Sequence, residues 1–370
     1  MINYINIKNF KSLKNIYLKP TNLNLCFGMN GMGKSSLLQI FLLLRQSCFK
    51  GTLQNTGLLL QGGELVTIGT GKDAFYQNAG KDETMTIAIK YAQGSEFVWQ
   101  FCYEGASDIL PLASFESNSQ LQQASLFTHQ FQYLSAEHLS PQKIYQKSAF
   151  EVTQHKNIGI KGEYAVHYLA HFGLNKINHP NLLHPNSSSE ILLHQTMAWL
   201  SEITPGTKLN VEDLKGTDLV RMGIQFETFD GYTNDFLPIN VGFGITYVLP
   251  LIVALLTAQA NDLILIENPE SHLHPKGQAV IGRLMALAAQ NGVQILAESH
   301  SDHIINGVRV AVKEGLIDKD KVSVYYFDRK RNTSAHETKI THIKIDSFGE
   351  LSHYPKGLLD EWQNLLMRLI

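Results

Sequence analysis

Short apolar runs of strand length alternate along the chain with longer segments that have a helical period. Residues 23–27 are largely apolar and predict a buried strand, and the apolar spacing of residues 36–44 predicts a helix after it. The same pattern of a strand and a helix recurs later in the chain. Helices are predicted over residues 245–258 and 278–289, and buried strands over residues 263–266 and 293–297. Strands that alternate with helices of this length indicate a parallel sheet wound with helices, and therefore an α/β fold.

Other segments surround this α/β core, whose central sheet we expect to be mixed. Residues 52–105 alternate in short β-like segments and predict an added antiparallel β layer. Residues 115–205 are largely polar without sustained heptads, which predicts a helical and variable insertion and excludes a long coiled coil. The chain closes with an amphipathic helix predicted over residues 357–370. We expect one large domain over residues 1–320 and a small C-terminal domain over residues 321–370.

Composition limits the partners and the compartment. The 31 Lys+Arg residues nearly balance the 33 Asp+Glu residues, so the net charge is −2 and any contact with nucleic acid must be local. Three cysteines without metal-ligand spacing suit a reducing cytoplasm. The N-terminus lacks the pattern of a signal peptide, and the longest apolar run, residues 247–258, contains Pro250 and is too short to span a bilayer. We therefore expect a soluble cytoplasmic protein with no membrane partner.

The glycine-rich stretch between the first buried strand and its helix carries the clearest chemistry. Residues 28–35 (GMNGMGKS) fit the phosphate-binding pattern G-x-x-x-x-G-K-[ST] at every fixed position. Glycine is needed there because backbone N–H groups must wrap a phosphate without an obstructing Cβ. Lys34 adds a positive charge for the β- and γ-phosphates, and the Ser35 hydroxyl is positioned to bind Mg²⁺. The residues predicted to bind ATP in this loop are Asn30, Gly31, Gly33, Lys34, Ser35 and Ser36.

A phosphate loop that works with Mg²⁺ needs an acid at the end of a neighbouring strand. Glu267 follows the apolar run at residues 263–266 and opens the sequence ENPESHLHP, which also holds Glu270. A second predicted strand ends in ESHSDH, which contains His300. Because the carboxyl ends of parallel strands meet at the same edge of a sheet, we expect both strand ends to reach the nucleotide.

Together these motifs resemble a known family. The phosphate loop, the segment VGFGIT at residues 241–246, the two acidic strand ends and the opening IKNFKSL at residues 7–13 are similar to predicted prokaryotic ATPases of the ABC type. That family is related to the overcoming-lysogenization-defect nucleases, the double-strand-break repair ATPases and the structural-maintenance-of-chromosomes proteins, and occurs in anti-phage defence modules. Residues 347–357 (SFGELSHYPKG) resemble the short C-terminal domain of unknown function that defines one branch. The resemblance implies an ABC-type P-loop ATPase head over residues 1–320.

The resemblance also implies roles for individual residues. Gly242 and Gly244 would belong to a degenerate ABC signature, whose backbone N–H groups contact the γ-phosphate held by a second subunit. Glu267 would hold Mg²⁺ together with Ser35, and His300 would sense the γ-phosphate. The resemblance therefore implies that the chain binds ATP and Mg²⁺ and forms a homodimer on ATP binding.

The sequence departs from the family pattern at two positions. Asn268 stands where typical ABC ATPases place the catalytic glutamate. Asparagine cannot act as a base, so either Glu270 positions the attacking water or hydrolysis is slow. His138 stands where relatives often carry arginine, which puts a phosphate-reading role for this position in doubt. The glutamine of the Q-loop could be Gln54, Gln61 or Gln132.

Three alternative functions are considered for a chain with these residues. The first is an ABC-type ATPase that binds and hydrolyses ATP with Mg²⁺, dimerises on ATP and controls a partner effector, a nuclease or a toxin. The second is the nucleotide-binding subunit of a membrane transporter, but residues 242–244 (GFG) match its standard signature of two central glycines and serine poorly. The third is a DNA-repair clamp ATPase, which the absence of a coiled-coil pattern disfavours.

Overall fold

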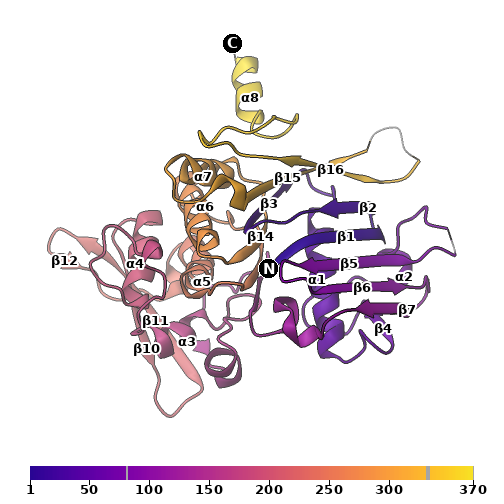
Figure 1. Cartoon of the computed structure of the whole chain (residues 1–370). Helices are drawn as coiled ribbons and strands as arrows, with labels where there is room; N and C mark the ends of the chain where they lie inside the picture. The colour runs from indigo at the N-terminus through magenta and orange to yellow at the C-terminus, as the bar shows by residue number, and fades with distance from the viewer. Residues whose placement is uncertain (81, 331–333, 370) are drawn as a thin grey trace. The chain divides into compact units, whose positions relative to one another are not determined.

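The computed structural model describes residues 1–80, 82–330 and 334–369, and in these the chain divides into two compact units (Figure 1). Unit 1 consists of residues 1–131, 320–345 and 351–370. Unit 2 consists of residues 132–319 and 346–350. The phosphate loop lies in unit 1, and the acidic ends of the two later strands lie in unit 2.

An antiparallel sheet of six strands in the order β2-β1-β5-β6-β7-β4 makes up much of unit 1. Figure 1 shows β2, β1, β5, β6 and β7 side by side. One face of this sheet is apolar: Ile7 of β1 lies opposite Ile16 of β2 and Ile87 of β5, and all three side chains are buried. The strands are β1 (Ile2–Phe10), β2 (Leu13–Leu18), β4 (Gly57–Leu59), β5 (Met85–Tyr91), β6 (Glu96–Phe101) and β7 (Ile109–Ser117).

Three further strands of unit 1 position the phosphate loop. β3 (Leu23–Gly28) is buried along its first five residues and runs directly into the loop, which α1 (Lys34–Phe49) follows. β15 (Val322–Arg329) pairs parallel with β3 and antiparallel with β16 (Thr338–Ile343). The remaining elements of unit 1 are α2 (Gly71–Ala74), the short helices η1 (Leu121–Gln123) and η2 (Ser125–Phe127), and α8 (Glu361–Leu369).

A parallel strand pair and three helices form the centre of unit 2. β13 (Leu263–Glu267) and β14 (Gln294–Glu298) pair in register, so that Glu267 lies opposite Glu298 at the end of the ladder. The four apolar residues of β13 are fully buried, as expected for a strand covered on both faces. The helices are α5 (Phe243–Thr257), α6 (Pro275–Gln290) and α7 (Asp302–Lys313), and α6 packs against both α5 and α7.

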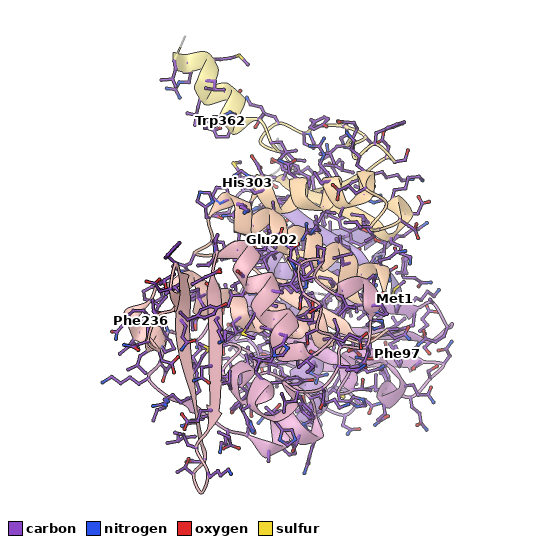
Figure 2. The ribbon with its side chains drawn as sticks, turned by 90° about the vertical axis from the view of Figure 1, so that its left-hand side faces the viewer. Met1, Phe97, Glu202, Phe236, His303 and Trp362 are labelled. Atoms are coloured by element: carbon purple, nitrogen blue, oxygen red, sulfur yellow. The ribbon has the colours of Figure 1, made fainter. Side chains whose placement is uncertain are left out.

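The rest of unit 2 is a small sheet with two helices. Arg283 of α6 donates to Glu202 of α4 at 2.6 Å, which ties α4 to α6, and buried His184 lies 2.7 Å from the same carboxylate. Figure 2 labels Glu202. The elements are β9 (Tyr145–Gln146), η3 (Phe150–Gln154), α3 (Ala165–Phe172), η4 (Pro180–Leu182), α4 (Leu192–Ile203), β10 (Thr207–Asp213), β11 (Leu219–Thr228), β12 (Gly231–Tyr232) and η5 (Pro238–Asn240). β8 (Phe131–Leu134) and η6 (Lys319–Lys321) lie where the chain passes from one unit to the other.

The predicted α/β fold with a mixed sheet, an antiparallel layer and an insertion is confirmed. The layer is larger than predicted from residues 52–105, because β1 and β2 pair into it. The C-terminal helix begins at Glu361 rather than at residue 357, and Ile370 lies outside the described residues. The domain boundary at residues 320 and 321 stays a prediction, although β15 pairs with the strand that carries the phosphate loop.

Candidate phosphate-binding site

The loop after β3 has the backbone of a phosphate cradle. Gly28, Gly31 and Gly33 have φ values of 141°, 77° and 98°, which side chains with a Cβ rarely adopt. A Cβ on Gly31 would meet nothing within 4 Å, so the space over this part of the loop is open. Lys34 is the first residue of α1, and its ammonium group donates to the carbonyls of Gly28 at 2.8 Å and Met29 at 3.0 Å. The loop thus presents a helix N-terminus and a fixed cation, which together suit an anion.

The hydroxyl groups of Thr338 and Ser12 lie against this loop. Thr338 of β16 donates its hydroxyl hydrogen to the carbonyl of Met32 at 2.9 Å and shares a hydrogen bond of 2.8 Å with the hydroxyl of Ser12. The backbone N–H of Thr338 also donates to the carbonyl of Ser12 at 2.9 Å. A Cβ on Gly33 would lie 2.6 Å from Thr338 Oγ1, so the loop rests directly on this threonine. No motif pointed to Thr338, because it lies far along the chain from the glycine-rich motif.

In unit 2, Glu267 ends β13 with a carboxylate held by two donors. The backbone N–H of Ala136 donates to its Oε2 at 3.2 Å, and the Tyr133 hydroxyl donates to the same carboxylate. Burial raises the pKa of Glu267, and these two hydrogen bonds oppose that shift. Burial also raises the pKa of Tyr133, and the negative charge of Glu267 raises it further. The carboxylate is therefore oriented at the carboxyl end of the strand, where a divalent cation would offset the cost of its burial.

Glu270 is tied to the chain that follows β14. Its Oε1 accepts the backbone N–H of His300 at 2.7 Å, and its Oε2 accepts the hydroxyl of Ser299 at 2.8 Å. Ser299 is fully buried, whereas His300 is exposed. Unit 2 therefore brings together Glu270 and His300, two of the residues predicted to serve catalysis, and the carboxylate holds the backbone of His300 in place.

The backbone gives Asn268 a conformational reason to be asparagine. Its φ is 48°, in the left-handed region that asparagine tolerates better than glutamate does. Its N–H donates to the carbonyl of Glu298 at 2.9 Å, and its own carbonyl accepts the N–H of Ser271 at 3.0 Å. Asn268 therefore makes the tight turn that carries the chain away from β13. Its correspondence to the usual catalytic glutamate stays a prediction.

The segment predicted as a signature opens α5. Gly242 is the N-cap, and a Cβ there would meet nothing within 4 Å. Gly244 is in the first turn, where a Cβ would lie 2.8 Å from the carbonyl oxygen of His272. Gly242 and Phe243 are also exposed, and the first N–H groups of a helix suit an anion.

Aromatic side chains gather beside this helix start. The His138 ring stacks on Tyr247 at 5.0 Å between centroids, and Tyr247 also contacts His272 at 4.4 Å. His138 Nδ1 donates to the carbonyl of Tyr247 at 2.9 Å, and burial lowers the pKa of His138. Phe243 stacks on His272 at 5.8 Å. A neutral, buried ring that packs against α5 gives His138 a structural role in unit 2, unlike an arginine that reads phosphate.

Of the three glutamines considered for a Q-loop, Gln132 is engaged inside unit 2. Its Nε2 donates to the carbonyls of Tyr133 and Gly159, both at 2.9 Å, and its Oε1 accepts the N–H of Ile158 at 3.2 Å. These bonds join β8 to the loop before α3. The choice among Gln54, Gln61 and Gln132 stays open.

The sequence was also compared with families of known proteins. The family described as "AAA domain, putative AbiEii toxin, Type IV TA system" matches residues 108–306, more than half of the chain. The chain belongs to this family. The family described as "AAA ATPase domain" matches residues 1–176, which include the phosphate loop. A family described as a protein of unknown function (DUF3696) matches residues 317–369, over the segment that resembles a small C-terminal domain. No curated protein matches the chain.

Solved structures of Smc head domains share the fold of this AAA-family chain. An SmcHead bound to the C-winged helix domain of ScpA has a TM-score of 0.54 at 13% identity, with 93% of this chain and 98% of that chain covered. An Smc head domain with an extended coiled coil, bound to the C-terminal domain of ScpA derived from Pyrococcus furiosus, has a TM-score of 0.50 at 11% identity, with 100% and 99% covered. The expected fold of an ABC-type P-loop ATPase head is thereby confirmed.

No helix within residues 1–80, 82–330 and 334–369 combines the length and the apolar character that crossing a membrane requires. The ligand roles predicted for individual residues stay predictions.

Proposed function

We propose that this chain binds and hydrolyses ATP with Mg²⁺, and that ATP drives two copies together to control a partner effector. The observation that carries the proposal is the phosphate loop. Three glycines with positive φ lead into α1. Lys34 is the first residue of α1, and its ammonium group donates to two carbonyls of the loop. Backbone N–H groups, a helix N-terminus and a fixed ammonium group form the set of donors that a triphosphate requires.

Each site residue takes a role that its chemistry allows. Lys34 places its charge on the β- and γ-phosphates, and the backbone of residues 30–36 wraps them. Mg²⁺ needs only one or two protein ligands beside the phosphates and water, and the Ser35 hydroxyl and the Glu267 carboxylate are of the right type. Held by these two residues, the metal would neutralise negative charge on the phosphates. Glu267 is fixed for that role by the hydrogen bonds from Ala136 and Tyr133.

Hydrolysis also requires a group that orients the attacking water. Glu270 is a fixed carboxylate whose oxygens each accept one hydrogen bond, and a carboxylate can accept more than two. In this proposal Glu270 accepts a proton from the water, while His300, whose backbone it holds, contacts the γ-phosphate. The usual position of the base holds Asn268, which cannot take the proton. We expect the replacement base at Glu270 to work slowly, which would leave the ATP-bound state long-lived.

The open N-terminus of α5 supports association of two copies. Gly242 leaves the helix start uncovered in unit 2, as a phosphate supplied by a second copy would need. The family's description links this AAA domain to a putative toxin and to a Type IV toxin–antitoxin system, and this supports a toxin or nuclease as the effector in a defence module. The near-neutral net charge places any nucleic-acid contact in a local patch.

The test is ATP turnover and ATP binding by the purified chain, together with its mass by light scattering with and without ATP and Mg²⁺. We expect hydrolysis and an ATP-dependent doubling of mass. Lys34→Ala should weaken ATP binding about 10- to 100-fold, since a hydrogen-bonded charge is lost. Lys50→Ala, at the exposed other end of α1, is the matched control and should change neither ATP binding nor ATP turnover. Equal binding by wild type and Lys34→Ala would refute the phosphate-loop assignment.

A further inference from the structure

The C-terminal helix α8 exposes a continuous apolar stripe. Trp362, Leu365, Leu366 and Leu369 recur at the spacing that places side chains on one face of a helix, and their side chains are 72%, 46%, 43% and 83% exposed. Isolated exposed apolar residues are ordinary, but four on one face of a short helix form a surface that gains free energy when it is covered. Figure 2 shows Trp362 on this helix.

Charge is segregated along α8. Asp360 and Glu361 lie at its N-terminus, Arg368 lies in its last turn, and the residues between them carry no charge. Glu361 and Arg368 are about two helical turns apart, so they lie on the same side of the apolar stripe. Both positions follow the helix dipole, which favours acids at the start and bases at the end.

We propose that α8 pairs antiparallel with α8 of a second copy of this chain. In that arrangement Glu361 of each copy lies beside Arg368 of the other, and a two-fold axis repeats the pair. A parallel pair would instead set Glu361 and Arg368 at the same levels as their copies and on opposite edges of the stripe, so that no acid would lie beside a base. Antiparallel pairing also sets each Trp362 toward the Leu369 end of the other helix, so that the two large indoles do not compete for the same space. The charge pattern of α8 is therefore complementary to itself in one orientation.

This contact is separate from the proposed ATP-dependent association. A pair of such short helices covers much less than the roughly 800 Å² per partner of a standard stable interface, so alone it should be weak. It would act by raising the local concentration of a second copy, or by joining ATP-bound pairs into larger assemblies. It requires no nucleotide, and so it can be tested without any.

The tryptophans of the chain supply a direct probe. Trp99 and Trp199 are 0% and 1% exposed, whereas Trp362 is 72% exposed. The emission that arises from a water-exposed indole therefore reports Trp362. In nucleotide-free protein we expect this emission to shift to shorter wavelength as concentration rises to about 0.1 mM, together with a rise in mass by light scattering.

Charge reversal tests the orientation. Glu361→Arg and Arg368→Glu should each weaken the pairing about tenfold, because each places like charges together twice across the two-fold axis. The double variant Glu361→Arg with Arg368→Glu should restore it, since opposite charges meet again. A chain that stays monomeric at about 0.1 mM, emission that is blue-shifted at every dilution, or a double variant that is not restored would each overturn the proposal.

Discussion

The Glu270 carboxylate accepts the backbone N–H of His300 at 2.7 Å, so the acid after β13 holds the chain that leaves β14. Its other oxygen accepts the hydroxyl of fully buried Ser299. One side chain thus fixes the geometry between two neighbouring strand ends and is also the candidate base. The two roles can be separated, because a glutamine can keep both hydrogen bonds while it loses the charge.

We expect Glu270→Gln to retain the melting temperature and ATP binding but to lose turnover about 10²- to 10⁴-fold, as removal of a general base does. The glutamine oxygen can accept the His300 N–H, and its N–H can donate to Ser299 Oγ. Glu270→Ala removes the acceptor of both the His300 N–H and the Ser299 hydroxyl, and should in addition destabilise the protein by about 1–3 kcal/mol. Single-turnover hydrolysis and thermal unfolding measure the two effects. If Glu270→Gln turns ATP over at the wild-type rate, Glu270 is a positioning residue only.

Asn268→Glu should speed hydrolysis severalfold if the asparagine slows turnover by withholding a base. The change has a structural cost, because the φ of 48° at this position disfavours a side chain that cannot bond locally. We therefore expect a lower melting temperature as well. Asn268→Gly is the matched control, since glycine accepts the backbone without supplying a carboxylate, and it should stay slow. A slower or unchanged rate for Asn268→Glu would remove this support for a long-lived ATP-bound state.

The sequence predicted those parts of the site that adjoin a motif, and missed those that depend on distant packing. The phosphate loop, its strand and its helix follow from glycine chemistry and apolar periodicity, and Glu267 was found because a carboxylate ends a buried run. Thr338 and Ala136 lie far from these motifs, and only folding brings Thr338 to Met32 or Ala136 to Glu267. The left-handed backbone of Asn268 was hidden for another reason: asparagine is common in loops of many conformations.

Thr338→Val should weaken ATP binding about tenfold, because the carbonyl of Met32 loses the donor that holds the phosphate loop. Thr338→Ser keeps the hydroxyl and is the control, with affinity expected close to wild type. Nucleotide titration measures both, and thermal unfolding confirms that β16 stays folded. A serine variant as weak as the valine variant would show that methyl packing, and not the hydrogen bond, supports the loop.

Burial of Glu267 makes the stability of the metal-free protein depend on pH. Because its pKa is raised in the folded state, ionisation costs stability, which is greatest below the ordinary glutamate pKa and falls as pH rises through the raised value. Glu267→Gln removes that cost, so without Mg²⁺ the variant should melt above wild type at pH 8, and the difference should shrink toward pH 5. With ATP and Mg²⁺ we expect the order to reverse, since glutamine would lose the charge with which Glu267 is proposed to hold the metal. Equal melting curves of wild type and Glu267→Gln at every pH would contradict a stability cost from the buried Glu267 charge.

The space around Gly242 allows a test of association that leaves the monomer intact. A substitution at Gly244 would disturb packing, since a Cβ there lies 2.8 Å from the carbonyl of His272, whereas a Cβ on Gly242 meets nothing within 4 Å. Gly242 has φ −57° and ψ 144°, which any residue adopts, and aspartate and asparagine both suit an N-cap.

We therefore expect Gly242→Asp to fold at least as stably as wild type, because an acid at a helix start is favourable. It should nevertheless lose the ATP-dependent rise in mass, because its carboxylate occupies the place where the γ-phosphate of a second copy would bind. Gly242→Asn has nearly the same shape without the charge and should keep most of the association. Light scattering with ATP and Mg²⁺ compares the three proteins. Association of Gly242→Asp at the wild-type level would show that the N-terminus of α5 does not receive a phosphate from a second copy.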